Sequence, residues 1–208
     1  MMDPSGAFNN QAAASADEAE QALKSWGVEY ERKPDGSLFV PGRLNISFRD
    51  LTCLPDLTSV TVGGDFDCSN NKLTSLKGAP AVVGGGFYCH RNQLASLEGA
   101  PASVAGNFNC CSNRLTSLKG GPVHVGERFI CDDNPLAFLE GAPETFQSME
   151  TDFGNFSSWE EVPVARRACP ETRARRIEAA VVDATVLQAA MSVRSPLRFK
   201  TRAFALQP

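Results

Sequence analysis

Hydrophobic and polar positions follow a pattern that returns every 21 residues along the middle of the chain. In its clearest copy, Val62, Gly64, Phe66 and Cys68 occupy every second position, and two leucines follow at the spacing L-x-x-L. Alternation with a period of two predicts a strand with one buried face. The leucines predict a return arm whose side chains point back inward. The glycine and proline after them predict a turn.

The full unit reads F-x-C-x-x-N-x-L-x-x-L-x-G-x-P, and four copies begin at Phe66, Phe87, Phe108 and Phe129. A fixed period of this length indicates stacked copies of one small unit. One unit buries about four apolar side chains, too few to offset its own ordering entropy, so stability must come from neighbouring units. The predicted fold is a mainly β solenoid with short strands on the concave face. Turns or short 3₁₀ pieces are expected on the convex face, with helical caps at both ends.

The pattern divides the chain into four segments. Residues 1–14 are rich in Ala, Ser and Asn and are predicted to be disordered. Residues 15–39 combine a capping-box pattern with a Pro-Asp-Gly turn signal, which predicts a helix–hairpin cap. Residues 40–163 form the solenoid, with a diverged first rung and a degenerate last rung at 144–163. Residues 164–208 hold nine Arg or Lys and predict a basic helix and tail.

Two repeat columns are expected to be structural. Seven cysteines are an odd number, and four of them recur at one inward position, so they predict buried apolar residues in a reducing compartment rather than disulfides. These four are Cys68, Cys89, Cys110 and Cys131. The asparagine column is expected to bond free backbone groups of its own and the next rung. Its members are Asn71, Asn92, Asn113 and Asn134. No metal site and no cofactor are predicted.

The residues between the inward positions should face outward, where adjacent strands lie about 4.8 Å apart and equivalent residues form columns. This face interrupts the repeat with individual side chains, including an aromatic residue and an arginine, which are typical binding anchors. The alternative is a merely solvated sheet face. The candidate partner-binding residues are Asp65, Asp67, Tyr88, His90, Asn107, Asn109, Arg128 and Ile130.

Composition narrows the function classes. The chain has 208 residues and a net charge of -4, which disfavours general nucleic-acid binding. No apolar run approaches the ~18 residues that span a bilayer. The N-terminus lacks the basic region and apolar core of a cleaved secretory signal. We therefore expect a cytoplasmic monomer, with export into a host cell without a cleaved signal peptide left open.

The segment F-x-C-x-x-N-x-L followed by L-x-x-L-x-G-x-P resembles the leucine-rich repeat, in the short variant found in bacterial and phage proteins. The resemblance covers residues 40–163. It implies a binding scaffold, so the leading expectation is a non-catalytic module that binds a protein partner through its concave face. The unit also resembles that of secreted bacterial effectors, although their returns are rich in Leu-Pro.

Two other functions stay open. The first is a bacterial effector or regulator that acts through the basic C-terminal helix, where Arg173, Arg175 and Arg176 cluster. The second is a thiol-dependent enzyme, because Cys131 and Asp133 form a Cys-x-Asp pattern that resembles the active-site motif of bacterial effector ubiquitin ligases. That chemistry belongs to a large helical domain, for which this chain has little room. No readable catalytic triad or phosphate-binding loop is present.

Overall fold

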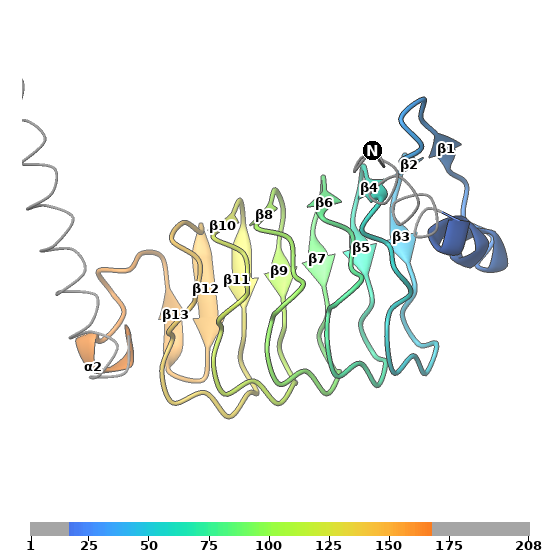
Figure 1. Cartoon of the computed structure of the whole chain (residues 1–208). Coiled ribbons are helices and arrows are strands. Elements are labelled where there is room, and N and C mark those ends of the chain that lie inside the picture. Colours follow the sequence, from blue (N-terminus) through green and yellow to red (C-terminus); the bar gives the residue numbers. More distant parts are fainter. Residues whose placement is uncertain (1–16, 168–208) are drawn as a thin grey trace, which may run out of the picture. The chain divides into compact units, whose positions relative to one another are not determined.

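The computed structural model describes residues 17–167. Over this range the chain is a β-solenoid of about five turns with few helices (Figure 1). The segment predicted as a disordered N-terminus (1–14) lies outside the described residues, and so does nearly all of the segment predicted as a basic helix and tail (164–208).

One long sheet runs the length of the solenoid, in the order β13-β12-β11-β9-β7-β5-β3. Its strands are parallel from β3 to β12, and equivalent phenylalanines of successive rungs are register partners. The strands are β3 (Leu44–Asn45), β5 (Phe66–Asp67), β7 (Phe87–Tyr88), β9 (Phe108–Asn109), β11 (Arg128–Ile130), β12 (Ser148–Thr151) and β13 (Gly154–Phe156).

Two smaller sheets are built from the segment that precedes each of these strands. The first has the order β1-β2-β4-β6, and the second pairs β10 with β8. Their strands are β1 (Glu31–Arg32), β2 (Leu38–Val40), β4 (Val60–Val62), β6 (Val82–Val83), β8 (Ser103–Val104) and β10 (His124–Val125). Each complete rung therefore contributes a strand to two different sheets.

The single strand predicted over residues 62–68 is wrong, because a corner divides it into β4 and β5. At the corner the rungs touch backbone to backbone. A Cβ on Gly63 would lie 2.7 Å from the carbonyl oxygen of Pro41, which leaves no room for a side chain. The predicted inward positions on both sides of the corner are buried, as at Val62, Phe66 and Cys68, whereas Gly64 at the corner itself is only half-buried.

The interior is a set of stacked columns. The four repeat phenylalanines are fully buried, and the ring centroids of successive members lie 5.1, 5.3 and 5.7 Å apart. Such spacing is favourable for aromatic pairs beyond the area they bury. The repeat cysteines and leucines fill the rest of the core.

A turn with left-handed backbone follows strands β5, β7, β9 and β11 of the long sheet. The residue before each column asparagine has φ of 53–54°, namely Asn70, Arg91, Ser112 and Asp133. The second turn of the rung uses glycine, as at Gly78 with φ 90°. Turns therefore connect the arms as predicted, whereas residues 17–167 contain no 3₁₀ helix.

The column asparagines bind the turn from inside. The Nδ2 group of Asn92 donates to the carbonyl of Cys89 in its own rung (3.1 Å) and of Cys68 in the preceding rung (3.0 Å). Its Oδ1 accepts from the backbone N–H of Leu73, 2.9 Å away. Asn71, Asn113 and Asn134 repeat the arrangement. The bonds join each rung to the one before it, whereas the sequence pattern had suggested the one after.

At the N-terminal end, residues 17–25 are helical and Ala19 and Leu23 are fully buried. The carboxylate of Glu20 accepts a hydrogen bond from Tyr30 Oη at 2.6 Å and binds Arg32. These hydrogen bonds, Tyr30 first, lower the pKa of Glu20 to about 2. They join the helix to Tyr30, just before strand β1, and to Arg32 within β1.

The C-terminal end departs from the repeat. Strand β12 continues the parallel sheet, but β13 turns back antiparallel to it, so the expected last rung at 144–163 is only half a rung. Trp159 Nε1 donates to the carbonyl of Pro143 at 2.9 Å and packs edge-on against Phe146. The short helix α2 (Val164–Arg167) follows, and its Arg166 carbonyl accepts from the N–H of Leu139.

Candidate functional site

The long sheet brings most of the predicted binding residues onto one face. Asp67, Tyr88, Asn109 and Ile130 are consecutive register partners on β5, β7, β9 and β11. The four repeat phenylalanines are register partners from strand to strand. The residues just before them therefore form a second column. That column contains Asp65, Gly86, Asn107 and Arg128.

Some of these side chains are engaged in local structure. Asp67 is only 7% exposed, and its Oδ1 accepts from the backbone N–H (3.0 Å) and hydroxyl (2.6 Å) of Ser69, while Oδ2 binds Arg43. Asn109 Oδ1 accepts from the N–H of Cys111 at 3.1 Å in the same way. An Asp or Asn that bonds the backbone two residues later makes an Asx turn. The sequence signal for these turns is the Asp or Asn itself, two residues before the backbone N–H that it binds.

Asp65 and Asn107 instead reach to the next rung. Asp65 Oδ1 accepts from the backbone N–H of Gly86 at 2.7 Å, and Asn107 Oδ1 accepts from that of Arg128 at 3.1 Å. In these two rungs, therefore, a side-chain oxygen accepts a hydrogen bond from a backbone N–H of the next rung that has no backbone partner. We call this arrangement the oxygen ladder.

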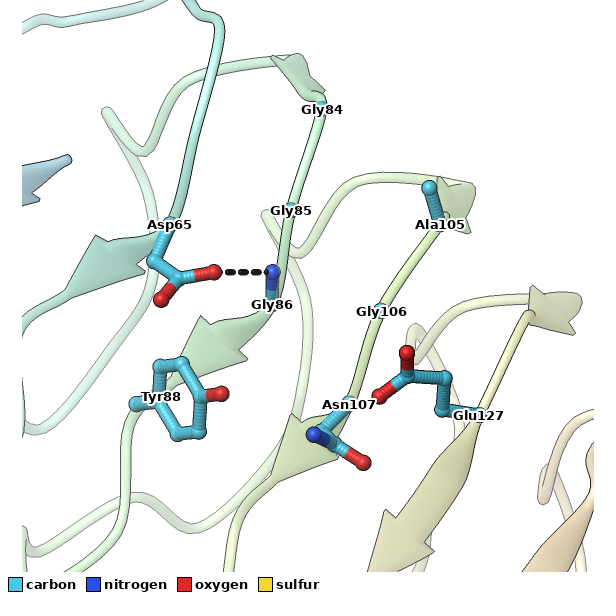
Figure 2. A pocket seen from close by; sticks show the side chains of 9 residues that line it. All are labelled: Asp65, Gly84, Gly85, Gly86, Tyr88, Ala105, Gly106, Asn107 and Glu127. Atoms are coloured by element: carbon cyan, nitrogen blue, oxygen red, sulfur yellow. Dashed lines mark hydrogen bonds between the residues drawn. The ribbon is translucent and has the colours of Figure 1, made fainter. Parts of the chain in front are cut away.

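A pocket of about 210 Å³ opens beside this ladder, at the corner between the sheets (Figure 2). Its floor is backbone, made of the three glycines 84–86 and Gly106. Asp65, Tyr88, Asn107 and Glu127 surround it. The tip of the Tyr88 ring covers Gly86, since a Cβ on that glycine would lie 2.7 Å from Tyr88 Oη.

Glu127 was not among the predicted site residues. Strict alternation places it on the inward side, between Gly126 and Arg128. The corner breaks that alternation, and its side chain is exposed at the rim of the pocket. The available signal for this corner was the one or more glycines that precede each strand, a single one in the rung of Glu127.

The remaining candidates lie along the same face. Arg128 is exposed, and its Nη1 lies 3.4 Å from Glu150 Oε1. Ile130 is half-buried. His90 is also half-buried, and burial lowers the pKa of its imidazole. Its Nδ1 has no hydrogen-bond partner within residues 17–167. Arg128 therefore offers a cationic contact, Ile130 an apolar contact and His90 a neutral aromatic contact.

The repeat thiols are poorly suited to chemistry. Cys68, Cys89, Cys110 and Cys131 are each 0% exposed, and burial raises the pKa of all four above its usual range. A thiol that stays protonated is a weak nucleophile and a weak metal ligand. Among the described residues, no group of three His, Cys, Asp or Glu side chains is arranged to hold a metal ion.

No protein-family profile, characterised protein or solved structure matches this chain. Its architecture is that of a repeat protein with turns of about 21 residues. Within residues 17–167 no helix is long and apolar enough to cross a membrane.

Proposed function

We propose that this protein is a non-catalytic interaction module that binds a protein partner through the outer face of the seven-stranded sheet. One observation carries the proposal: the inward columns repeat the same residue, whereas the outward columns change at every rung. Phe66, Phe87 and Phe108 stack inside, while their outward neighbours are Asp67, Tyr88 and Asn109. Residues that vary on one face of an otherwise regular scaffold are typical of a surface that recognises a specific partner.

The scaffold also supports tight recognition. Each rung is joined to its neighbours by backbone hydrogen bonds and by the buried asparagines. A surface that is already ordered loses little conformational entropy when it binds. The exposed Arg128–Glu150 pair is held weakly, as surface ion pairs contribute only about 0–1 kcal/mol. Its guanidinium is therefore available to a partner on the same sheet face as the aromatic anchor Tyr88, two strands away.

We further propose that residues 40–163 are kin to the short leucine-rich repeats, that the binding face is the concave one, and that the protein acts as a cytoplasmic monomer. The motif and its spacing support the kinship. A thiol-dependent activity is less favoured, because the four repeat thiols are buried. A role for the basic segment 164–208 is supported by its composition alone.

Affinity capture with the full chain tests the proposal. The double variant Tyr88→Ala/Arg128→Ala removes two exposed anchors of the long sheet. The matched control, Val82→Ala/His124→Ala, removes two exposed side chains of the smaller sheets. We expect a partner that the wild type and the control capture and the double variant does not. Equal capture by all three proteins would refute the proposed face and direct attention to residues 164–208.

A further inference from the structure

The oxygen ladder is interrupted at Gly86. Successive rungs carry Arg43, Asp65, Gly86, Asn107 and Arg128 at this position. Asp65 and Asn107 each cap the backbone N–H of the following rung. Gly86 has no side chain to do this, and within residues 17–167 the backbone N–H of Asn107 has no hydrogen-bond partner. The two arginines also supply no acceptor. At Gly86 the tip of the Tyr88 ring lies where a side chain would stand, so that position opens only when the ring turns aside.

Gly86 and Tyr88 both line the pocket described above, and the hydrogen-bond donors and acceptors around that pocket are not matched with one another. The Asn107 N–H is a donor that lacks an acceptor. Glu127 forms no side-chain hydrogen bond or ion pair within the described residues, and Asp65 uses only one of its two oxygens there. The hydroxyl of Tyr88 is likewise unbonded there. In Figure 2 the Asp65 and Glu127 carboxylates stand on opposite sides of the glycine floor.

We propose that this pocket binds a primary carboxamide, the side chain of an asparagine or glutamine on the protein partner. The inference rests on the proposed function and specifies what that partner presents. The carbonyl oxygen of the ligand accepts from the Asn107 N–H, just as the Asn107 carboxamide accepts from the N–H of Arg128. The amide NH₂ donates to the carboxylates of Asp65 and Glu127. The partner thus supplies the missing member of the ladder.

Two related ligands fit less well. A carboxylate would accept from the Asn107 N–H, but it would stand between the negative charges of Asp65 and Glu127, and like charges in contact are disfavoured. An ammonium or guanidinium would satisfy both carboxylates, but it has no acceptor, so the Asn107 N–H would lose water and gain nothing. The neutral carboxamide satisfies the donor and the acceptors together.

Ligand titration followed by NMR tests the chemistry directly. The full chain, labelled with ¹⁵N, is titrated with the N-acetyl, N-methylamide derivatives of Asn, Gln, Asp and Lys. We expect the Asn107 amide proton to move downfield and to saturate with the Asn or Gln derivative, and to respond weakly to the Asp and Lys derivatives. Tighter binding of Asp or Lys would overturn the proposal. Acetamide that binds as tightly as a nine-residue peptide with a central Asn would make the ligand a free small amide instead.

Gly86→Asn provides a variant that fills its own pocket. The new carboxamide is placed to cap the Asn107 N–H, and only the tip of the flexible Tyr88 side chain must move aside. We expect affinity for the carboxamide probe to fall about tenfold or more, the equivalent of one lost hydrogen bond. Unchanged affinity in a folded Gly86→Asn protein would overturn the proposal.

A second pair of variants does not depend on that substitution folding well. Glu127→Gln removes a rim charge that forms no side-chain hydrogen bond or ion pair within residues 17–167, and we expect roughly threefold weaker probe binding. Glu98→Gln removes an exposed carboxylate outside the pocket and should leave binding unchanged. An equal effect of both substitutions would mean that only the overall charge matters, which contradicts a specific pocket.

Partner capture then separates this inference from the proposed function. Loss of the partner with Gly86→Asn, together with loss of probe binding, supports both. Normal capture by Gly86→Asn, with loss in the Tyr88→Ala/Arg128→Ala variant, keeps the binding face and refutes the carboxamide pocket. Normal capture by both variants refutes both.

Discussion

Replacing Asn92 with alanine tests how the rungs are held together. Asn92 is 9% exposed, and its side chain makes hydrogen bonds to the backbone of Cys68, Cys89, His90 and Leu73. The three carbonyls keep another partner after the substitution, since Asn71, Asn113 and the N–H of Asn70 also donate to them. The N–H of Leu73 has no other acceptor and would be left buried and unpaired.

The expected loss follows from this difference. An orphaned buried donor costs about 1–3 kcal/mol, and each lost but partly compensated hydrogen bond about 0.5–1.5 kcal/mol. Asn92→Ala should therefore lower the free energy of unfolding by about 2–4 kcal/mol. The neighbouring substitution Gln93→Ala, whose side chain makes no hydrogen bond in residues 17–167, should cost less than about 0.5 kcal/mol.

Urea unfolding followed by circular dichroism and by tryptophan fluorescence provides the assay. Trp26 and Trp159 lie toward opposite ends of the described chain, so fluorescence reports the ends and circular dichroism reports the whole. Because repeat proteins are held by nearest-neighbour contacts, a break at Asn92 should also separate the two transitions. A loss within about 0.5 kcal/mol of that for Gln93→Ala, with coincident transitions, would show that the asparagine column does not join the rungs.

Three further predictions concern the corner, the core and the N-terminal end. Gly126→Ala should lower the free energy of unfolding in urea by about 1–3 kcal/mol or more, because the new Cβ would lie 2.0 Å from the Ala105 carbonyl oxygen. Gly42→Ala is the control and should leave that free energy unchanged, because its Cβ would have no atom within 4 Å. The four repeat thiols should react with a colorimetric thiol reagent only after unfolding, so fast reaction in the native protein would contradict their burial. The Glu20 carboxylate should make its full contribution to the free energy of unfolding above its unfolded pKa near 4.5. That contribution should be lost as the pH falls toward the folded pKa of about 2. Tyr30→Phe should flatten that dependence of the urea midpoint on pH, and an unchanged profile would refute the assignment.

The repeat made the interior predictable. A period of 21 residues with Phe, Cys and Leu at fixed positions leaves one stacking arrangement that buries them all, and it also defines the outward column of Asp67, Tyr88, Asn109 and Ile130. The core and the register follow from the same constraint, because a shift of one residue would turn every buried side chain outward.

The corner between the sheets could not be predicted from the sequence pattern in the same way. The buried positions keep the same phase on both sides of the glycine pair, so Val62 and Phe66 look like one strand in the sequence although they lie in different sheets. The corner is fixed by backbone contacts between rungs, which have no side-chain signature except the glycines themselves. The same bend exposes Glu127, and it creates the pocket that the linear pattern did not suggest.

The uniform step between rungs has a mechanical consequence. The hydrogen bonds between adjacent rungs lie on a series of parallel strands, so tension applied through the two ends of the described chain loads the outermost rung before the next. Each rung that detaches releases one repeat, which spans about 70 Å when fully extended. A stretching experiment should therefore record a staircase of nearly equal steps at low force, and the solenoid would lengthen in fixed increments as an elastic tether.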